Sequence, residues 1–390
     1  MENLKEQFRA QLDQVDSGFI RYLHDQIEWD ARLIALLGAR GVGKTTLLLQ
    51  HIRMNNNIDD TLFVSADDLY FTQHTLVELA TTFYKNGGKH LYIDEIHRYK
   101  NWSKEVKNIY DQLPQLQVVY TGSSILDLEE GGSDLSRRKL QYYLYGLSFR
   151  EYLAMAEGLE LPVHSLESIL NNRIDFPYRT HRPIQLFKEY LRSGYYPFFK
   201  EKAYLIRLSN VILQTLEVDI PQFANMNVGT THKLRTLLYI IAQSVPFKPN
   251  FSKLARDLDI SRNDVKDLIF YLEKAGLLSQ LRSDTGGIML LGKTEKIYLD
   301  NTNLAYAISS DTPDLGNLHE TAFFMLTRVT QDVKSSTVSD FTIGDYTFEV
   351  GGKAKSRKQI KNVENSYIVK DDIEYGSNGT IPLWTLGLGY

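Results

Sequence analysis

The residues best suited to chemistry form a glycine-rich stretch, GARGVGKT, at positions 38–45. An apolar segment precedes it and an apolar helical pattern follows, which is the strand–loop–helix setting of a phosphate-binding loop. Glycines let backbone N–H groups curl around phosphate oxygens, and the following helix adds the positive end of its dipole. We expect Lys44 to reach the β- and γ-phosphates of a nucleotide and the Thr45 hydroxyl to bind Mg²⁺. The predicted nucleotide-binding residues are Gly38, Ala39, Arg40, Gly41, Val42, Gly43, Lys44, Thr45 and Thr46.

Two adjacent acids, Asp94 and Glu95, close the apolar segment that begins at residue 90. Adjacent carboxylates at the end of a buried strand are costly unless a cation or a reaction requires them. We expect Asp94 to support Mg²⁺, often through water, and Glu95 to orient and polarise the attacking water. Together with the loop, this pair predicts a site for nucleotide hydrolysis.

A further apolar segment, LQVVYTGSS at 116–124, ends in small polar residues. Ser123 or Ser124 would contact the γ-phosphate between the two motifs, and Thr121 is a less favoured candidate. The alternative is a turn that caps a helix.

Arg137 and Arg138 stand just before another expected strand. An arginine there would neutralise the transferring phosphate, either within the chain or across a subunit contact. The alternative is a solvated arginine pair, and the sequence does not choose between the two residues.

Strands alternate with helices up to residue 155, with one strand expected at 61–65. This order predicts an α/β fold with a doubly wound parallel sheet that binds phosphate at the carboxyl ends of its strands. The net charge of −4 over 390 residues is not that of a protein that coats nucleic acid. The chain has no cysteine, no apolar leader and no apolar run long enough to cross a membrane, so we expect a cytoplasmic protein.

The stretches GARGVGKTTLL, YIDEIHRYKNW, VVYTGSS, DLSRR and YGLSFREYL together resemble a prokaryotic family of AAA+-like P-loop ATPases with a C-terminal domain of unknown function. FKEYLRSGYYPF at 187–198 matches the helical region of that family, so the resemblance covers the full length. It implies a Mg-ATP-dependent ATPase whose core is followed by a winged helix and a degenerate restriction-endonuclease-like fold. The preference for ATP over GTP rests on this resemblance.

Four domains are expected on this basis. They are an ATPase core with an N-terminal helix (1–155), a helical lid or linker (156–228), a winged helix (229–309) and a nuclease-like domain that we expect to be inactive (310–390). Three amphipathic helices and a hairpin with a Gly286-Gly287 turn indicate the winged helix. Five basic and five acidic residues balance within 251–276, so a winged helix that packs or binds a protein competes with one that binds DNA.

The segment VSDFTIGDYTFEV at 338–350 predicts a hairpin with a two-residue Gly344-Asp345 turn. That turn places Asp340 directly opposite Glu349, where like charges repel. Either water screens the two carboxylates or a divalent cation binds between them.

Glu320, on an expected helix, would supply a third carboxylate. Glu, Asp and Glu-x-Lys is the pattern of restriction-type nucleases, in which carboxylates hold Mg²⁺ and a lysine helps to activate water. Here Gly351 occupies the lysine position, Lys353 would have to reach back, and Gln359 is a plausible polar remnant. We therefore expect a nuclease-like scaffold with a vestigial site and without cleavage.

The leading hypothesis is a Mg-dependent ATPase that couples its nucleotide state to a conformational change or to engagement of DNA or another partner. One alternative is a nucleotide-dependent DNA-binding or DNA-processing module with a residual nuclease site. The other is a slow nucleotide-sensing scaffold for a protein partner. The basic segment 353–361 would contact DNA phosphates or an acidic partner, or form a solvated face. A homo-oligomer is left open, because only an arginine acting across subunits requires one.

Overall fold

The computed structural model contains two compact units, Met1–Gly146 and Leu147–Tyr390. The structure describes residues 1–124, 135–283, 293–309, 313 and 315–390. Among these residues, none of the helices combines the length and the apolar character needed to cross a membrane.

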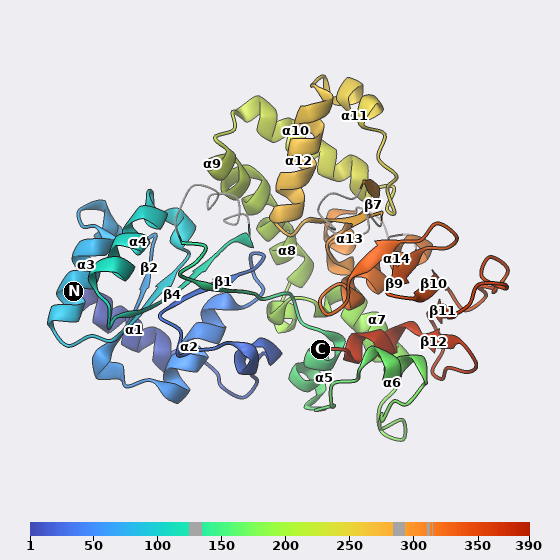
Figure 1. Cartoon of the computed structure of the whole chain (residues 1–390), viewed down its shortest axis with the longest axis horizontal. Coiled ribbons are helices and arrows are strands. Elements are labelled where there is room, and N and C mark those ends of the chain that lie inside the picture. The colour runs from blue at the N-terminus through green and yellow to red at the C-terminus, as the bar shows by residue number, and fades with distance from the viewer. Residues whose placement is uncertain (125–134, 284–292, 310–312, 314) are drawn as a thin grey trace. The chain divides into compact units, whose positions relative to one another are not determined.

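The first unit is built around a five-stranded parallel sheet with the strand order β2-β3-β4-β1-β5 (Figure 1). The central strands are buried along their length, as expected for a parallel sheet covered on both faces. The strands are β1 (Leu33–Leu37), β2 (Thr61–Ser65), β3 (His90–Asp94), β4 (Gln117–Gly122) and β5 (Leu140–Tyr143).

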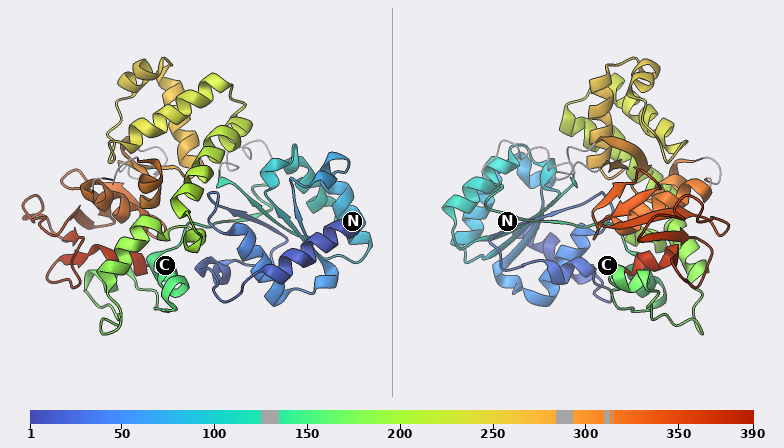
Figure 2. Two further views of the ribbon diagram at one scale, coloured as in Figure 1. Left: turned by 180° about the vertical axis from the view of Figure 1, so that it is seen from behind. Right: turned by 45° about the vertical axis from the view of Figure 1, so that its right-hand side comes forward.

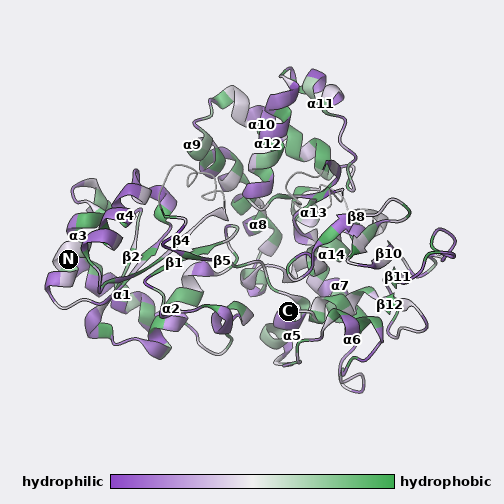
Figure 3. Ribbon diagram, viewed as in Figure 1, coloured by the Kyte–Doolittle hydropathy of each residue, from purple (hydrophilic) through white to green (hydrophobic). Residues whose placement is uncertain are grey.

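Four α-helices cover this sheet, α3 and α4 on one face and α1 and α2 on the other (Figures 1 and 2). Leu33, Ala35 and Leu37 of β1 pack in one apolar cluster with α3 and α4. The helices expose hydrophilic residues on their outer sides (Figure 3). The bounds are α1 (Glu2–Gln14), α2 (Lys44–Asn55), α3 (Leu76–Lys85) and α4 (Trp102–Gln112), with short 3₁₀ turns η1 (Tyr22–Gln26), η2 (Ile58–Asp60), η3 (Leu69–Thr72) and η4 (Ile96–Arg98). The doubly wound parallel sheet predicted from the sequence is confirmed.

The second unit begins with a series of helices. They are α5 (Phe149–Glu157), α6 (Leu166–Leu170), α7 (Pro183–Glu189), the π-helix η6 (Tyr190–Gly194), the 3₁₀ turn η7 (Pro197–Lys200), α8 (Tyr204–Gln214), the π-helix η8 (Thr215–Asp219) and α9 (Ile220–Ala224).

Three helices and an antiparallel strand pair follow, in the order expected of a winged helix. They are α10 (Val228–Ala242), α11 (Phe251–Leu258), α12 (Arg262–Lys274), β6 (Leu278–Arg282) and β7 (Thr294–Leu299). Gly286 and Gly287, predicted to form the hairpin turn, lie outside the described residues. The winged-helix assignment stays a prediction.

The last part of the chain forms a mixed five-stranded sheet, in the order β12-β11-β10-β9-β8, against which α14 packs. The pairing of Ile343 with Tyr346 confirms the predicted two-residue turn at Gly344 and Asp345. The elements are α13 (Thr302–Ile308), α14 (Leu315–Thr327), β8 (Val333–Ser335), β9 (Phe341–Ile343), β10 (Tyr346–Gly351), β11 (Ser366–Lys370), β12 (Thr380–Pro382) and the 3₁₀ turn η10 (Leu383–Leu388). The nuclease-like assignment also stays a prediction.

Candidate active site

The predicted phosphate-binding loop connects β1 to α2, whose first residue is Lys44. Gly41 and Gly43 have φ angles of 84° and 97°, a conformation that other residues adopt only with strain. A Cβ atom on Gly38 would collide with the backbone oxygen of Leu144, just after β5. The glycines are therefore required by the loop itself, because it turns tightly and packs against a neighbouring strand end.

The Lys44 ammonium group is held within the loop. Its Nζ donates hydrogen bonds to the carbonyl oxygens of Gly38 (3.0 Å) and Ala39 (3.1 Å), and the side chain is buried. A buried cation among backbone carbonyls next to a helix N-terminus favours an anion in the same loop. This geometry fits the predicted contact of Lys44 with phosphate.

Arg21 contacts the loop from outside, and no sequence motif predicts this role. It is buried and donates to the carbonyl oxygens of Val42 (2.7 Å), Tyr145 (2.8 Å) and Gly146 (2.9 Å). These bonds connect the loop to the segment after β5. Arg21 precedes the 3₁₀ turn η1 and no motif surrounds it, so only the tertiary structure identifies it.

Asp94 lies beside the loop because β3 and β1 are both parallel to β4. Its Oδ2 accepts a hydrogen bond from the Thr45 hydroxyl (2.7 Å), and its Oδ1 accepts one from the Thr121 hydroxyl. Burial raises the pKa of Asp94 above its usual value, although the two hydroxyl bonds work in the opposite direction. The negative charge of a buried carboxylate is poorly solvated, so a bound cation would stabilise it.

The oxygen donors of Thr45 and Asp94 fit Mg²⁺, which commonly binds through one or two protein oxygens together with substrate phosphates and water. Within the described ranges, no group of three or more His, Cys, Asp or Glu side chains is arranged to hold a metal ion. A magnesium ion at Thr45 and Asp94 would therefore need nucleotide oxygens to complete its ligands.

Glu95 has a left-handed backbone, with φ 52° and ψ 42°, and its side chain is partly exposed. Its N–H group donates to the Thr121 hydroxyl (3.0 Å). One hydroxyl, that of Thr121, thus contacts both residues of the acidic pair. The sequence had ranked Thr121 below Ser123 and Ser124, yet the Thr121 hydroxyl makes these two hydrogen bonds. Ser123 is buried, and its backbone N–H donates to His97 Nδ1 at 3.5 Å.

The two arginines proposed to neutralise phosphate lie at the amino ends of the strands, whereas the phosphate-binding loop lies at their carboxyl ends. β5 is parallel to β1 and pairs Leu140 with Ile34, so residues just before β5 lie at the amino end of β1. The loop follows the carboxyl end of β1. Arg138 forms an ion pair with Asp111 (3.1 Å), whereas Arg137 is exposed. The sequence left open whether an arginine acts within the chain or across subunits. The sheet separates both arginines from Lys44, which disfavours action within the chain.

In the second unit, Lys296 lies between two of the three carboxylates predicted to form a vestigial site. Its Nζ is 2.7 Å from Glu320 Oε2 and 3.3 Å from Asp340 Oδ1. Asp340 Oδ2 also accepts a hydrogen bond from the backbone N–H of Val350 (3.0 Å). The sequence suggested water or a divalent cation between Asp340 and Glu349. In the structure, Lys296 of β7 balances the charge of Asp340 together with that of Glu320.

Glu349 is almost fully buried, and it is neutralised by Lys355 and not by Lys353, the lysine considered in the sequence. Lys355 Nζ lies 2.6 Å from its Oε1, while Lys353 is exposed. The Ser339 hydroxyl donates to Oε2, and the Gln359 amide nitrogen, when turned toward the carboxylate, donates at 3.0 Å. Burial works to lower the pKa of Lys355, but the bond to Glu349 and the surrounding acids raise it overall.

The basic segment 353–361 is only partly available to a partner. Lys355 is used on Glu349, and Arg357 donates to the carbonyl oxygens of Asn378 (3.1 Å) and Ser366 (2.9 Å). Lys353, Lys358 and Lys361 are exposed. Three lysines are a modest surface for a nucleic acid.

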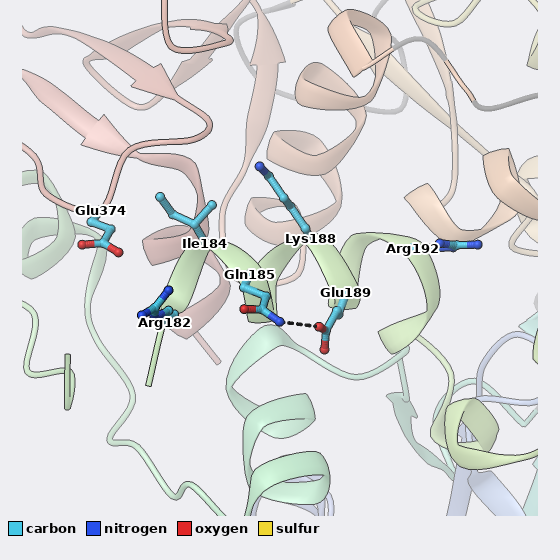
Figure 4. A pocket seen from close by; sticks show the side chains of 7 residues that line it. All are labelled: Arg182, Ile184, Gln185, Lys188, Glu189, Arg192 and Glu374. Carbon is cyan, nitrogen blue, oxygen red and sulfur yellow. Dashed lines mark hydrogen bonds between the residues drawn. The ribbon is translucent and has the colours of Figure 1, made fainter. Parts of the chain in front are cut away.

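A surface pocket of about 500 Å³ lies along α7 and the start of η6, and sequence reasoning did not find it (Figure 4). Lys188 forms an ion pair with Asp372 (2.8 Å), and Gln185 donates to Glu189 (3.3 Å). Mixed charges and these internal pairs leave little net attraction for a charged ligand. The pocket is lined by Arg182, Ile184, Gln185, Lys188, Glu189, Arg192 and Glu374.

Comparisons with known proteins agree with the fold of the first unit. Residues 30–153 match the model of a family described as an AAA domain, and residues 184–315 match a domain of unknown function, DUF8612. The loop and the acidic pair both lie within the residues that match the AAA domain.

A relative from Methanocaldococcus jannaschii, named only as an uncharacterized protein, is 31% identical over 269 residues. The match covers 64% of this chain and 56% of the relative, so the chain spans little more than half of that protein.

Solved structures with weak overall similarity include Hsp104 of S. cerevisiae with ADP and DnaA of Aquifex aeolicus with AMPPCP. The Hsp104 match has a TM-score of 0.33 and 18% identity, and covers 70% of this chain and 41% of that one. The DnaA match has a TM-score of 0.27 and 15% identity, and covers 69% and 86%.

Proposed function

We propose that this protein binds ATP with Mg²⁺ and hydrolyses it to ADP and phosphate. The observation that carries the proposal is the hydrogen bond between Thr45 and Asp94, which brings the two halves of the predicted site together beside the buried Lys44. Adenine is the expected base because residues 30–153 match an AAA domain. Hydrolysis is expected to drive a conformational change or the engagement of a partner.

Each residue of the site has a separate task in this reaction. The loop N–H groups and Lys44 bind the β- and γ-phosphates and neutralise charge that develops on them. Thr45 and Asp94 hold Mg²⁺, which when bound supplies further positive charge to the phosphate oxygens. Glu95 accepts a hydrogen bond from water and orients it for in-line attack on the γ-phosphorus. The Thr121 hydroxyl fixes the position of both acids through its contacts with Asp94 and Glu95.

An arginine from a second copy of the chain would complete the site. Arg137 is the better candidate, because it is exposed while Arg138 is paired with Asp111. An arginine at the amino ends of the strands can reach a nucleotide only on a neighbouring subunit. This arrangement implies a homo-oligomer during hydrolysis.

The test is phosphate release from Mg-ATP by the purified protein and by two variants. Lys44→Ala should lose tight ATP binding, because the phosphates lose their main cationic partner. Glu95→Gln should keep binding and lose turnover. Lys89→Ala is the matched lysine control, since Lys89 is exposed and pairs with Asp60 at the start of β3. Unchanged ATP affinity in Lys44→Ala would refute the loop assignment, and wild-type turnover in Glu95→Gln would remove Glu95 from the mechanism.

A second candidate is a DNA-responsive ATPase whose C-terminal domain retains a nuclease-like scaffold. The supporting observation is the meeting of Glu320, Asp340 and Glu349 around Lys296 and Lys355. We expect no cleavage, because Lys296 occupies the space between Glu320 and Asp340 that a divalent cation would need. Phosphate release measured with double-stranded DNA, with the DNA examined on a gel, distinguishes the cases. Faster phosphate release with the DNA left intact would support this candidate. Nicking of the DNA that is lost in Glu349→Ala would support an active nuclease. Phosphate release that does not change with DNA would favour a protein partner.

A further inference from the structure

We infer that His97 is a positioning residue for the proposed hydrolysis, and that it links the water-orienting carboxylate of Glu95 to the end of β4. The inference rests on the proposed function and adds a residue that neither the motifs nor the family match assigns. His97 Nε2 lies 3.3 Å from Glu95 Oε2, and its Nδ1 accepts a hydrogen bond from the backbone N–H of Ser123 at 3.5 Å.

The backbone of Glu95 explains why these two side chains meet. The left-handed conformation at Glu95 bends the chain directly after β3, and the 3₁₀ turn η4 (Ile96–Arg98) follows. The bend brings the side chain at position 97 back alongside the side chain at position 95. A positive φ at a glutamate costs about 1 kcal/mol or more, and such strain is concentrated at functional sites. Here the bond from the Glu95 N–H to Thr121 helps to hold the strained residue.

The contact with Ser123 determines which nitrogen of His97 carries the proton. A backbone N–H can only donate, so Nδ1 must be the unprotonated acceptor of a neutral ring. The proton of that neutral ring is then on Nε2, which lies 3.3 Å from Glu95 Oε2, so a small rotation of either side chain would form a hydrogen bond between them. His97 is only 10% exposed, so the surrounding protein holds the ring in this orientation and water competes little for its polar contacts.

The sheet order makes this link relevant to the γ-phosphate. β4 lies between β1, which leads into the phosphate-binding loop, and β3, which leads into Glu95. Ser123 follows β4, so it stands between the two parts of the site. A movement of Ser123 toward or away from bound phosphate is transmitted through His97 to Glu95. His97 thereby couples occupation of the γ-phosphate site to the position of the carboxylate that orients water.

The experiment compares His97→Phe with His97→Gln in the full chain. Phe keeps a ring of similar size but loses the polar contacts with Glu95 and Ser123. Gln can accept from the Ser123 N–H through its oxygen and donate to Glu95 through its nitrogen. We expect His97→Phe to lower kcat for ATP by about 10- to 100-fold, the usual cost of losing a residue that orients a catalytic group, with ATP affinity unchanged. His97→Gln should recover most of that loss.

A matched control is His90→Phe, at the other end of the same strand, where His90 contacts Gln117. It should leave kcat unchanged. In the Glu95→Gln background, His97→Phe should have no further effect, because the two residues act through one carboxylate. If His97→Phe lowers the melting temperature too far for assay, His97→Asn replaces it, since its side chain is too short to make both contacts.

Wild-type kcat in His97→Phe would overturn the inference while leaving the proposed function intact. Equal losses in the Phe and Gln variants, or an additional loss in the Glu95→Gln background, would also overturn it and indicate a purely structural histidine. Absence of ATP turnover in the wild-type protein would instead overturn the proposed function, and this role with it.

Discussion

Thr45 and Asp94 are 49 positions apart in the chain, yet the Thr45 hydroxyl donates a 2.7 Å hydrogen bond to Asp94 Oδ2. The contact brings the first turn of α2 next to the end of β3. Because Asp94 is 6% exposed, its carboxylate depends on hydroxyl donors and, in the proposed complex, on a cation. The buried charge of Asp94 therefore lowers the stability of the nucleotide-free protein, although the proposed activity requires it.

Asp94→Asn should lose hydrolysis but stabilise the nucleotide-free protein. Asn retains hydrogen bonds to Thr45 and Thr121 while it removes a desolvated negative charge, which should raise the free energy of unfolding by about 1 kcal/mol. The measurement is thermal unfolding with a chelator present, alongside phosphate release. A melting temperature several degrees below that of the wild type would contradict the prediction.

The stabilisation by Asp94→Asn should depend on pH. Since the pKa of Asp94 is raised in the folded protein, the native state keeps its proton at pH values where the unfolded chain has lost it. The charge penalty in the wild type therefore grows as pH rises through the folded-state pKa. The difference between variant and wild type should be larger at pH 7 than near pH 4, and a difference that grows toward acid pH would refute this cause.

Arg137→Ala should lose turnover in a way that a second inactive variant repairs. If Arg137 acts on a neighbouring subunit, a mixture of Arg137→Ala with Glu95→Gln contains pairs with one intact site and one intact arginine. Mixing should restore part of the activity, and turnover per protomer should rise with protein concentration. Arg138→Ala is the control, because Arg138 is paired with Asp111. Failure of the mixture to exceed the sum of its components would exclude action across subunits.

His51 should make the first unit sensitive to acid. Burial and the nearby His24 and His90 lower the pKa of His51 to about 3, and the ring stacks on Trp29 at 3.6 Å. Between pH 6.5 and 3 the unfolded chain binds a proton that the folded chain does not, so stability is lost as pH falls through this window. We expect His51 to contribute about 2 kcal/mol to this loss, after allowance for screening.

His51→Phe keeps the stacking on Trp29 and removes the titrating group. Urea unfolding followed by tryptophan fluorescence should show a smaller loss of stability between pH 7 and 4.5 than in the wild type. His74→Phe, at an exposed histidine of the same unit, should behave as the wild type does. An identical pH dependence in His51→Phe and the wild type would show that His51 is not responsible.

Lys355→Met should destabilise the second unit much more than Lys353→Met. Removing Lys355 leaves the buried Glu349 carboxylate without its 2.6 Å cationic partner, which should cost about 2–3 kcal/mol because Ser339 and Gln359 remain. Lys353 is exposed and should change stability by less than about 0.5 kcal/mol. Combining Lys355→Met with Glu349→Gln should recover most of the loss. Equal midpoints of urea unfolding for the two lysine variants would contradict the prediction.

The sheet of the first unit could be predicted because its signals are local. Apolar runs such as Leu33–Leu37 read as buried strands, and glycines at 38, 41 and 43 mark the loop that follows. The short turn at Gly344 and Asp345 similarly fixed the register that brings Asp340 near Glu349. In each case neighbouring residues carry the information, because turn geometry and side-chain periodicity depend on the chain within a few positions.

The partners of the charged groups could not be predicted in the same way. Lys296 comes from β7 to balance Glu320 and Asp340, and Lys355 reaches Glu349 from the loop after β10. Nothing in the spacing of these lysines distinguishes them from Lys353. Long flexible side chains pair with whichever acid the surrounding packing brings within reach, and that depends on the whole sheet.

By itself, the sequence determined the phosphate-binding loop, the acidic pair and the parallel sheet that carries them, since each is written in a contiguous stretch. Only the tertiary structure decided that Thr121 contacts both acids and that His97 lies against Glu95. It also decided that Arg137 lies at the amino ends of the strands, away from the phosphate-binding loop. The physical reason is strand register. The position of one strand end relative to another is set by hydrogen bonds and packing between segments far apart in the chain, and these leave no local pattern in the sequence.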